Sequence, residues 1–259
     1  MIWYNWHKKR IRGADMEKKY TEILDLRACE CDMTGAWRPS AILETMQETA
    51  GVHSAMCNLP RSAMDAMGLA WVLSRTRVEM LRIPRMGEKI TIETYPTSVR
   101  HMFFPRSHVF YDAAGEKIGC ANSLWVVIDI ETRRIVKGEG IAEKLPDNGD
   151  MAMAAGMPAT VRPCGGEAVN GIITPSFTDM DVNIHVNNAR YLDWCCNALG
   201  IELLSEKCIM GFDVNYDAEI RPGCGIRTEL TREDDSFAFC GFEGARRHFA
   251  VAGKLAKRS

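Results

Sequence analysis

An internal repeat is the feature that most constrains the fold, because a segment that occurs twice predicts two copies of one structural unit. Asp32-Met-Thr-Gly-Ala-Trp37 matches Asp181-Val-Asn-Ile-His-Val186, 149 positions further on. Pro84-x-x-Gly87 then matches Pro222-x-x-Gly225 with a shift of 138. The matches follow in the same order, and 259 residues exceed the roughly 100–200 of one ordinary domain. We therefore predict two similar domains.

Each copy contains one long predicted helix. Apolar residues recur every three or four positions in Pro39–Cys57 and in Asn188–Leu204, which is typical of a helix buried along one face. The predicted apolar faces consist of Ile42, Met46 and Ala50 in the first helix and of Tyr191, Leu192, Cys195, Cys196 and Leu199 in the second.

Strands are predicted after each helix. Apolar residues alternate with period two in Ile90–Ile92, Leu124–Ile130 and Phe237–Phe239, the pattern of half-buried strands. The turn-forming segments Asp112–Gly115 and Glu233–Ser236 predict hairpins between strands. A helix followed by antiparallel strands thus occurs twice, which predicts the α+β class.

The boundaries follow from changes in composition. A stretch rich in Gly, Ala, Met and Pro lies between the copies and predicts a linker. We assign residues 16–148 to the first domain, 149–163 to the linker and 164–259 to the second domain. Residues 1–15 are basic but lack the apolar stretch of a secretory signal, so we expect a tail or an extension there.

Composition narrows the classes of partner. Hydrophobic residues make up 46% and charged residues 25%, which is ordinary for a globular protein. A net charge of -2 without a basic field argues against a nucleic-acid partner, and no apolar run predicts a membrane span. Ten cysteines without metal-binding spacing are expected to be free thiols. We therefore expect a cytoplasmic protein that has no metal site.

The two copies differ at the positions that are able to do chemistry. In the second copy, reactive side chains replace inert ones: Asn183 replaces Thr34, His185 replaces Ala36 and Glu219 replaces Leu81. The second copy alone is therefore predicted to hold an active site.

Polar residues are dense in the segment 179–188, directly before the second predicted helix. Asp181, Asn183 and His185 alternate, so an extended backbone would aim their side chains to one side. Asn187 and Asn188 are explained as turn or cap residues. A cap does not require an imidazole, so the three alternating residues are candidate catalytic groups.

This segment carries a family resemblance. Asp179-Met-Asp-Val-Asn-Ile-His-Val-Asn-Asn-Ala-Arg-Tyr-Leu-Asp-Trp194 closely resembles the signature of the plant and bacterial acyl-acyl carrier protein (acyl-ACP) thioesterase family. Further on, Tyr216 precedes Glu219 by three residues, which resembles the family segment that contains a catalytic Glu. The segments similar to the family's N-terminal domain are Trp71–Arg75, Glu93–Pro96, Arg106 and Ser123–Asp129.

The resemblance covers about Tyr20–Leu255 and implies a tandem double hot-dog fold, each unit a long central helix wrapped by an antiparallel β-sheet. It implies a thioester hydrolase without a cofactor, which converts fatty acyl-ACP to free fatty acid and holo-ACP and so ends chain elongation in fatty acid biosynthesis. It places the catalytic roles on Asp181, Asn183, His185 and Glu219. Family members often carry a Cys after the Glu, but Ile220 stands here, so no cysteine nucleophile is expected at that site.

The expected mechanism uses water as the nucleophile. Glu219 acts as a general base or attacks directly, with His185 hydrogen-bonded to it or to the substrate. Asn183 holds the water or donates to the thioester oxygen. Asp181 orients Asn183 or His185.

The first domain is expected to bind the acyl chain. Its candidate lining residues, for which plain core packing is the alternative, are Met46, Val52, Met56, Met64 and Met67. The carrier is acidic, so a basic surface should receive it, formed either by Arg133, Arg134 and Lys137 or by Arg246 and Arg247. A monomer and a homodimer are both compatible with two fused units.

Three other functions remain open from the sequence. An acyl-CoA thioesterase shares the expected chemistry. A hydroxyacyl-ACP dehydratase shares the expected fold, and His101-Met-Phe-Phe-Pro105 resembles its motif only weakly. A non-catalytic acyl-binding module would not require Asn183, His185 and Glu219.

Overall fold

The computed structural model describes residues 17–138 and 140–258, so the predicted tail at 1–15 lies outside the described residues. The helices are α1 (Pro39–Met56), α2 (Arg61–Ala66), α3 (Arg190–Leu199) and α4 (Ile201–Glu206). The first half contributes the strands β1 (Tyr20–Asp25), β2 (Leu69–Met80), β3 (Lys89–Pro96), β4 (Phe104–Tyr111), β5 (Lys117–Asp129) and β6 (Ile135–Val136). The second half contributes β7 (Val169–Ile173), β8 (Lys207–Tyr216), β9 (Ile226–Glu233), β10 (Ser236–Glu243) and β11 (Arg246–Lys257).

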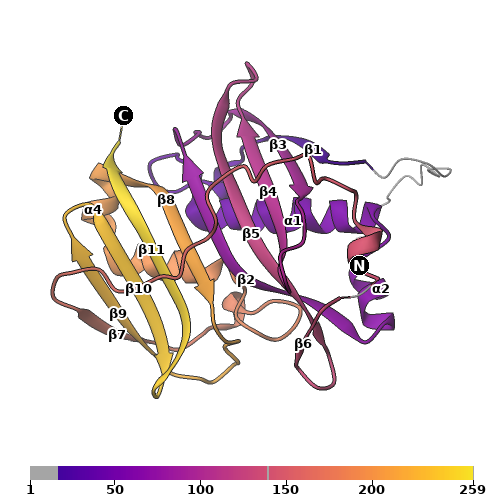
Figure 1. The fold of residues 1–259 in the computed structure, drawn as a ribbon. Helices are drawn as coiled ribbons and strands as arrows, with labels where there is room; N and C mark the ends of the chain where they lie inside the picture. The colour runs from indigo at the N-terminus through magenta and orange to yellow at the C-terminus, as the bar shows by residue number, and fades with distance from the viewer. Residues whose placement is uncertain (1–16, 139, 259) are drawn as a thin grey trace.

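All these strands belong to one antiparallel sheet (Figure 1). Its order is β1-β3-β4-β5-β2-β8-β11-β10-β9-β7, and β6 pairs with β5. The two halves meet at β2 and β8, where Arg75 lies opposite Asn215 and Glu79 opposite Gly211. Because the order β2-β5-β4-β3 on one side mirrors β8-β11-β10-β9 on the other, the halves are two copies of one unit. The predicted repeat is thereby confirmed.

The hairpin predictions are correct. The segment Asp112–Gly115 joins β4 to β5, and the Asp112 N–H donates to the Glu116 carbonyl over 2.9 Å. Asp234 lies between β9 and β10 with a φ of 51°, in the left-handed region that Asp tolerates in tight turns. Of the predicted alternating segments, Ile90–Ile92 and Phe237–Phe239 fall in β3 and β10, and Leu124–Ile130 falls in β5 except for Ile130.

The long helices lie on one face of the sheet (Figure 1) and form the core with it. The predicted apolar faces are at most 7% exposed at Ile42, Met46, Ala50, Tyr191, Leu192, Cys195 and Leu199. Arg190 of α3 forms an ion pair with Glu44 of α1, which ties the two helices together. The ring of Tyr191 stacks on Phe249 of β11 with the centroids 4.3 Å apart.

The prediction of one continuous second helix is wrong. α3 ends at Leu199 and α4 begins at Ile201, with Gly200 between them at a φ of 88° and a ψ of 158°. Only glycine adopts this backbone conformation without a steric cost, so Gly200 permits the break. Gly51, which lies 149 positions before Gly200 as in the repeat, stays helical inside α1. The first unit therefore keeps a longer uninterrupted helix than the second.

Residues 146–163, which we call the strap, cross the opposite face of the sheet from the first half to the second (Figure 1). Polar side chains of the strands hold this segment. The Ala154 N–H donates to Ser107 over 3.1 Å, and the Val161 N–H donates to the Asn215 side chain over 2.8 Å. Asn122 also donates to the carbonyls of Ala155 and Gly156. The predicted linker is thus bonded to the sheet along its length.

The fold is a tandem double hot-dog of the α+β class, as the family resemblance implied. The domain boundaries at residues 148 and 164 stay predictions. All ten cysteines lie in the described part of the chain and are free thiols. Among the described residues, the structure contains no helix with both the length and the apolar character to cross a membrane.

Candidate active site

The repeated motif forms the same tight turn in both halves. The Asp32 N–H donates to the Ala36 carbonyl and the Asp181 N–H donates to the His185 carbonyl, each over 2.8 Å. In both turns the aspartate carboxylate accepts the backbone N–H two residues later, at Thr34 over 2.8 Å and at Asn183 over 2.7 Å. The alignment of Asn183 with Thr34 and of His185 with Ala36 is therefore confirmed.

The expectation of an extended segment at Asp181–His185 is wrong. The bond from the Asp181 N–H to the His185 carbonyl closes the segment into a turn, so side-chain alternation does not apply. The Asp181 carboxylate accepts N–H groups of Asn183 and His185 and the Nδ2 of Asn183 at 3.2 Å. Asp181 thus builds the turn that places Asn183 and His185.

Ile184 occupies the position of Gly35 in this turn, with a φ of 61° compared with 79° for the glycine. A β-branched residue in the left-handed region is an outlier that costs about 1–2 kcal/mol. The side chain of Ile184 is 69% exposed and lies at the cavity described below. The second turn therefore carries backbone strain that its counterpart lacks.

His185 and Glu219 form the central contact of the site. Nε2 of His185 lies 3.2 Å from Oε2 of Glu219, and the two side chains are only 20% and 34% exposed. Arg133, from the turn between β5 and β6, forms an ion pair with the same carboxylate oxygen. His248 of β11 lies 3.0 Å from the backbone carbonyl of Glu219 and fixes the main chain there.

The sequence alignment of Glu219 with Leu81 needs a correction. The Trp37 N–H donates to the Pro84 carbonyl and the Val186 N–H donates to the Ile220 carbonyl, each over 2.9 Å. Ile220 thus stands in the place of Pro84, and Glu219 in the place of Ile83. The glycine–proline match misled the alignment because the loop after Ile220 is two residues longer. The chemical contrast between the halves is unchanged.

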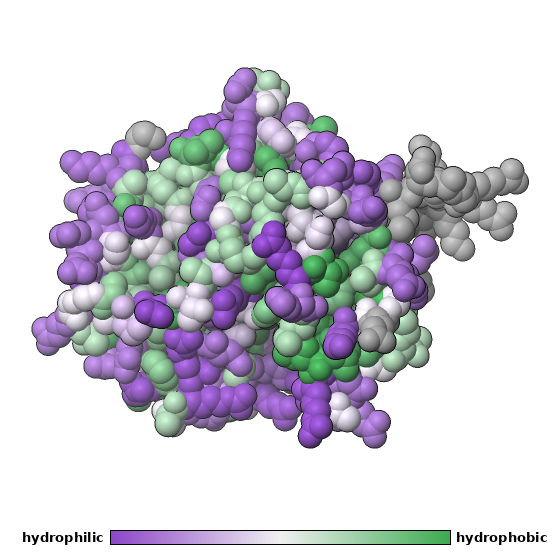
Figure 2. All heavy atoms as spheres, in the orientation of Figure 1, coloured by the Kyte–Doolittle hydropathy of each residue, from purple (hydrophilic) through white to green (hydrophobic). Residues whose placement is uncertain are grey.

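A cavity of about 660 Å³ opens beside this turn. The second half contributes Val182, Asn183, Ile184 and His185, and most of the remaining wall comes from the first half. Its apolar wall includes Leu59, Met64, Trp71, Phe104, Trp125 and Leu145. Figure 2 shows hydrophobic surface gathered over the region where α2 and β6 lie in Figure 1, ringed by hydrophilic residues. The cavity therefore lies between the turn that carries Asn183 and His185 and an apolar wall of the first half, whose lining also contains charged residues such as Arg61, Asp65 and Arg133.

Of the five predicted lining residues, Met64 borders this cavity. Met46 instead packs in the main core, and Met67 is exposed with its sulfur 3.8 Å from Lys144 Nζ. Val52 and Met56 do not line the cavity, because the stripe of α1 that faces it contains Gln47, Ala50, Gly51 and Ser54. The sequence predicts which residues share one face of the helix but not which face borders the cavity, and this explains the errors.

A buried cation also borders the cavity. Arg106 is 7% exposed, and its Nη1 lies 3.0 Å from Nδ1 of His53 and 3.2 Å from Oγ1 of Thr94. Among the described residues no carboxylate forms an ion pair with it, and burial lowers its pKa to about 10. Burial and then the Arg106 charge lower the pKa of His53 to about 4 and that of His108 to about 3. These two imidazoles are therefore neutral near neutral pH.

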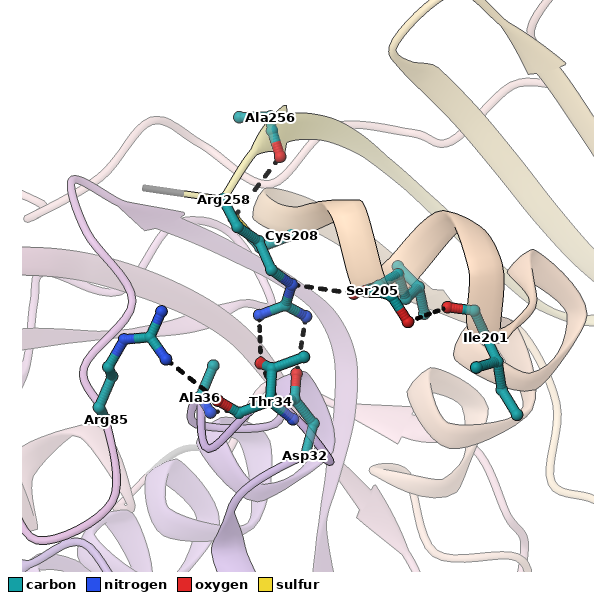
Figure 3. A network of polar contacts seen from close by, with 10 residues as sticks. Asp32, Thr34, Ala36, Arg85, Ile201, Ser205, Cys208, Ala256 and Arg258 are labelled. Carbon is teal, nitrogen blue, oxygen red and sulfur yellow. Dashed lines mark hydrogen bonds and ion pairs between the residues drawn. The ribbon is translucent and has the colours of Figure 1, made fainter.

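The turn of the first half holds a different network (Figure 3). Arg258, which follows β11, donates to Asp32 Oδ2 over 2.8 Å and to Thr34 Oγ1 over 2.6 Å. The same guanidinium donates to the Leu204 carbonyl over 2.9 Å. An arginine of the second half thus occupies the groups that correspond to Asp181 and Asn183.

The structure brings the four predicted catalytic residues together. Asn183 and His185 line the cavity, Asp181 supports both from behind, and Glu219 contacts His185. Their catalytic roles stay predictions. Arg133 is the residue whose place in the site the sequence did not reveal, because it lies 86 positions before Glu219 in a surface turn without a local signal.

Two hot-dog units that share one sheet, with a carboxylate–imidazole pair beside an apolar cavity, define the class of double hot-dog proteins. Two family profiles match the chain and narrow this class to one family. The profile of the acyl-ACP thioesterase N-terminal domain matches residues 17–142, and that of the acyl-ACP thioesterase C-terminal domain matches residues 167–243. The chain belongs to the acyl-ACP thioesterase family.

Individual proteins show the same likeness. A chloroplastic palmitoyl-acyl carrier protein thioesterase from Gossypium hirsutum is 25% identical over 233 residues, which are 84% of this chain and 55% of that protein. An acyl-ACP thioesterase from Bacteroides thetaiotaomicron has a TM-score of 0.83 at 23% identity, covering 92% of this chain and 98% of that one. For the 12:0-ACP thioesterase from Umbellularia californica, the TM-score is 0.80 at 21% identity, with 95% and 100% covered. The chain spans about half the length of the curated plant relatives that it matches.

Proposed function

We propose that this protein hydrolyses the thioester of fatty acyl-ACP to a free fatty acid and holo-ACP. The observation that carries the proposal is the His185–Glu219 pair, 3.2 Å apart, at a turn that borders an apolar cavity. The proposed substrate matches this arrangement, because its thioester joins a long apolar acyl chain to a polar arm. The two family profiles support this substrate class.

In the proposed reaction, the oxygen of a water molecule attacks the thioester carbonyl carbon. The His185–Glu219 pair takes the proton of the water, and the carbonyl electrons move to the oxygen of the tetrahedral intermediate. The amide of Asn183 donates a hydrogen bond to that oxygen. Collapse of the intermediate breaks the carbon–sulfur bond, and the leaving thiolate takes the proton back from the pair.

The acyl chain is proposed to lie in the cavity, against the apolar wall supplied by the first half. Gly51 of α1 offers a direct test, because it borders the cavity and a Cβ added there meets no atom within 4 Å. Gly51→Leu should fill part of the space without disturbing the helix, since leucine is the better helix former. The preferred chain length should therefore become shorter. Ala55→Leu, on an exposed position of α1 outside the lining, is the matched control.

The function is tested with panels of acyl-ACP and acyl-CoA substrates of increasing chain length, with thiol release as the readout. Faster release from acyl-ACP than from acyl-CoA supports the proposal. A preference for acyl-CoA would favour the acyl-CoA thioesterase alternative, and binding without turnover would favour an acyl-binding module. Dehydration of a hydroxyacyl substrate is not expected, because His101 lies in an exposed turn outside the cavity lining.

A further inference from the structure

We propose that Arg133 is a positioning residue of this active site, which holds the Glu219 carboxylate in the orientation that faces His185. The assignment rests on the proposed thioester hydrolysis by the His185–Glu219 pair. It concerns a residue of the first half that acts on the chemistry of the second half.

Two contacts restrain the Glu219 carboxylate. Its Oε2 atom lies 3.2 Å from His185 Nε2 and is also the atom that pairs with Nη2 of Arg133. A carboxylate on a flexible Glu side chain otherwise has several rotamers open to it. Contacts from two side chains to one oxygen restrict that freedom, and a charge-assisted hydrogen bond from a guanidinium is stronger than a neutral one.

The turn that carries Arg133 is itself firmly built. The Asp129 carboxylate accepts the Thr132 N–H over 2.7 Å and the Thr132 hydroxyl over 2.8 Å, and these bonds lower the pKa of Asp129. The Arg133 N–H donates to the Asp129 carbonyl over 2.9 Å. Arg133 has a φ of 59°, in the left-handed region that a residue such as Gly or Asn adopts at lower cost. An arginine occupies this position although the backbone favours a smaller residue.

The other half of the molecule shows a corresponding arrangement. β5 and β11 are equivalent strands, since each lies next to the seam strand of its own half. Arg133 follows β5 and reaches Glu219 of the second half, whereas Arg258 follows β11 and reaches Asp32 of the first half. In the first half the arginine meets a turn without His185 or Glu219. An arginine that crosses between the units is thus a feature of both halves, and only in one does it meet a catalytic carboxylate.

The charges around Glu219 predict how removal of Arg133 changes the protonation of the site. Among the described residues, Arg133 and His185 contact the Glu219 carboxylate, and His248 contacts the Glu219 backbone carbonyl. The buried Tyr191 also senses this charge: burial raises the pKa of Tyr191, and the charges of Asp181 and Glu219 raise it further. Arg133 is the permanently cationic one of these groups. Its loss should therefore make protonation of the His185–Glu219 pair easier.

The test compares Arg133→Gly, Arg133→Lys and the control Arg232→Ala, at an exposed position of β9, in the full chain with acyl-ACP as substrate. Arg133→Gly should lower kcat by about tenfold to a hundredfold with KM nearly unchanged. The acid limb of its pH–rate profile should move up by about one pH unit. Its melting temperature should stay equal or rise, because glycine suits a φ of 59°. Arg133→Lys should recover part of kcat, and Arg232→Ala should behave as the wild type.

Wild-type kcat and pH profile in Arg133→Gly would overturn the assignment. A rise in KM alone would also overturn it, because Arg133 would then bind the carrier or its arm. A wild-type protein without thioesterase activity overturns the proposed function instead. In that event, NMR titration of the His185 ring still decides the positioning contact: its midpoint should move up in Arg133→Gly, and an unchanged midpoint contradicts the contact.

Discussion

Arg77 and Asp213 face each other across the seam between the two halves, joined by Nε–Oδ1 at 3.0 Å and Nη2–Oδ2 at 2.7 Å. Both side chains are partly buried, and the pair is directly opposed in the β2–β8 register. Asp213 also accepts the Ala159 N–H of the strap over 3.0 Å. One carboxylate therefore links both halves of the sheet and the segment that crosses it.

Asp213→Ala should consequently lower the free energy of unfolding by about 1–3 kcal/mol, since a two-pronged guanidinium contact and a backbone N–H lose their acceptor. Urea unfolding measures this change. Asp235→Ala, at an exposed ion pair with Lys207, is the control and should lower the free energy of unfolding clearly less. Equal losses of unfolding free energy in the two variants would show that the Arg77–Asp213 pair stabilises the protein no more than an exposed ion pair does.

Removal of either member of the catalytic pair should abolish most of the turnover without unfolding the protein. Glu219→Gln and His185→Ala are each expected to lower kcat by about 10²–10⁴-fold, the usual contribution of a positioned proton acceptor. Both side chains lie at the site rather than in the core, so the melting temperatures should change little. Near-normal turnover in both variants would contradict the proposed pair.

Asp181 should act on catalysis through the shape of the turn. Asp181→Ala removes the acceptor of the Asn183 and His185 N–H groups and should lower kcat by about 10²-fold, because both side chains then lose their positions. Asp181→Asn keeps a carbonyl oxygen as acceptor and should lose less. Equal activity of the two variants would show that charge rather than hydrogen bonding is what matters. The rates are measured together with circular dichroism to monitor folding.

Ile184→Gly should separate stability from activity. Relief of the left-handed strain should raise the free energy of unfolding by up to about 1 kcal/mol, whereas loss of a residue that borders the cavity should raise KM. The reverse change in the other half, Gly35→Ala, meets no atom within 4 Å and should destabilise by about 1 kcal/mol through the backbone alone. Denaturant unfolding and steady-state kinetics measure both effects. A destabilised Ile184→Gly would disprove the strain.

Stability should fall as the pH decreases from about 6.5, because His53 and His108 are buried in the neutral form. Unfolded histidines take up protons near pH 6.5, whereas the folded pKa values are about 4 and about 3. The unfolded state therefore binds more protons in this window, and each histidine contributes a slope of up to about 1.4 kcal/mol per pH unit. Urea unfolding between pH 7.5 and pH 5 checks the slope. His108→Asn should make it shallower, and an unchanged slope would refute the assignment.

The repeat, the class of fold and the segments that carry chemistry can be recognised in the amino-acid sequence alone. These are local properties: apolar periodicity fixes the helix and strand faces, and a motif that occurs twice is visible without a structure. The replacement of Thr34 by Asn183 and of Ala36 by His185 marked the second turn as the reactive one. The backbone hydrogen bonds of the two turns later gave the same alignment.

Other features depend on distant segments coming together and are set by the tertiary fold. The closed turn at Asp181, the break at Gly200 and the cavity-facing stripe of α1 depend on backbone conformation and on packing against other elements. Arg133 meets Glu219 only because β5 and β8 lie on either side of β2 in one sheet. The spacing of Arg133 and Glu219 in the sequence does not predict this contact, because the pairing of strands across the sheet brings the two residues together. The repeat therefore predicted two units, and their shared sheet decided how one unit completes the active site of the other.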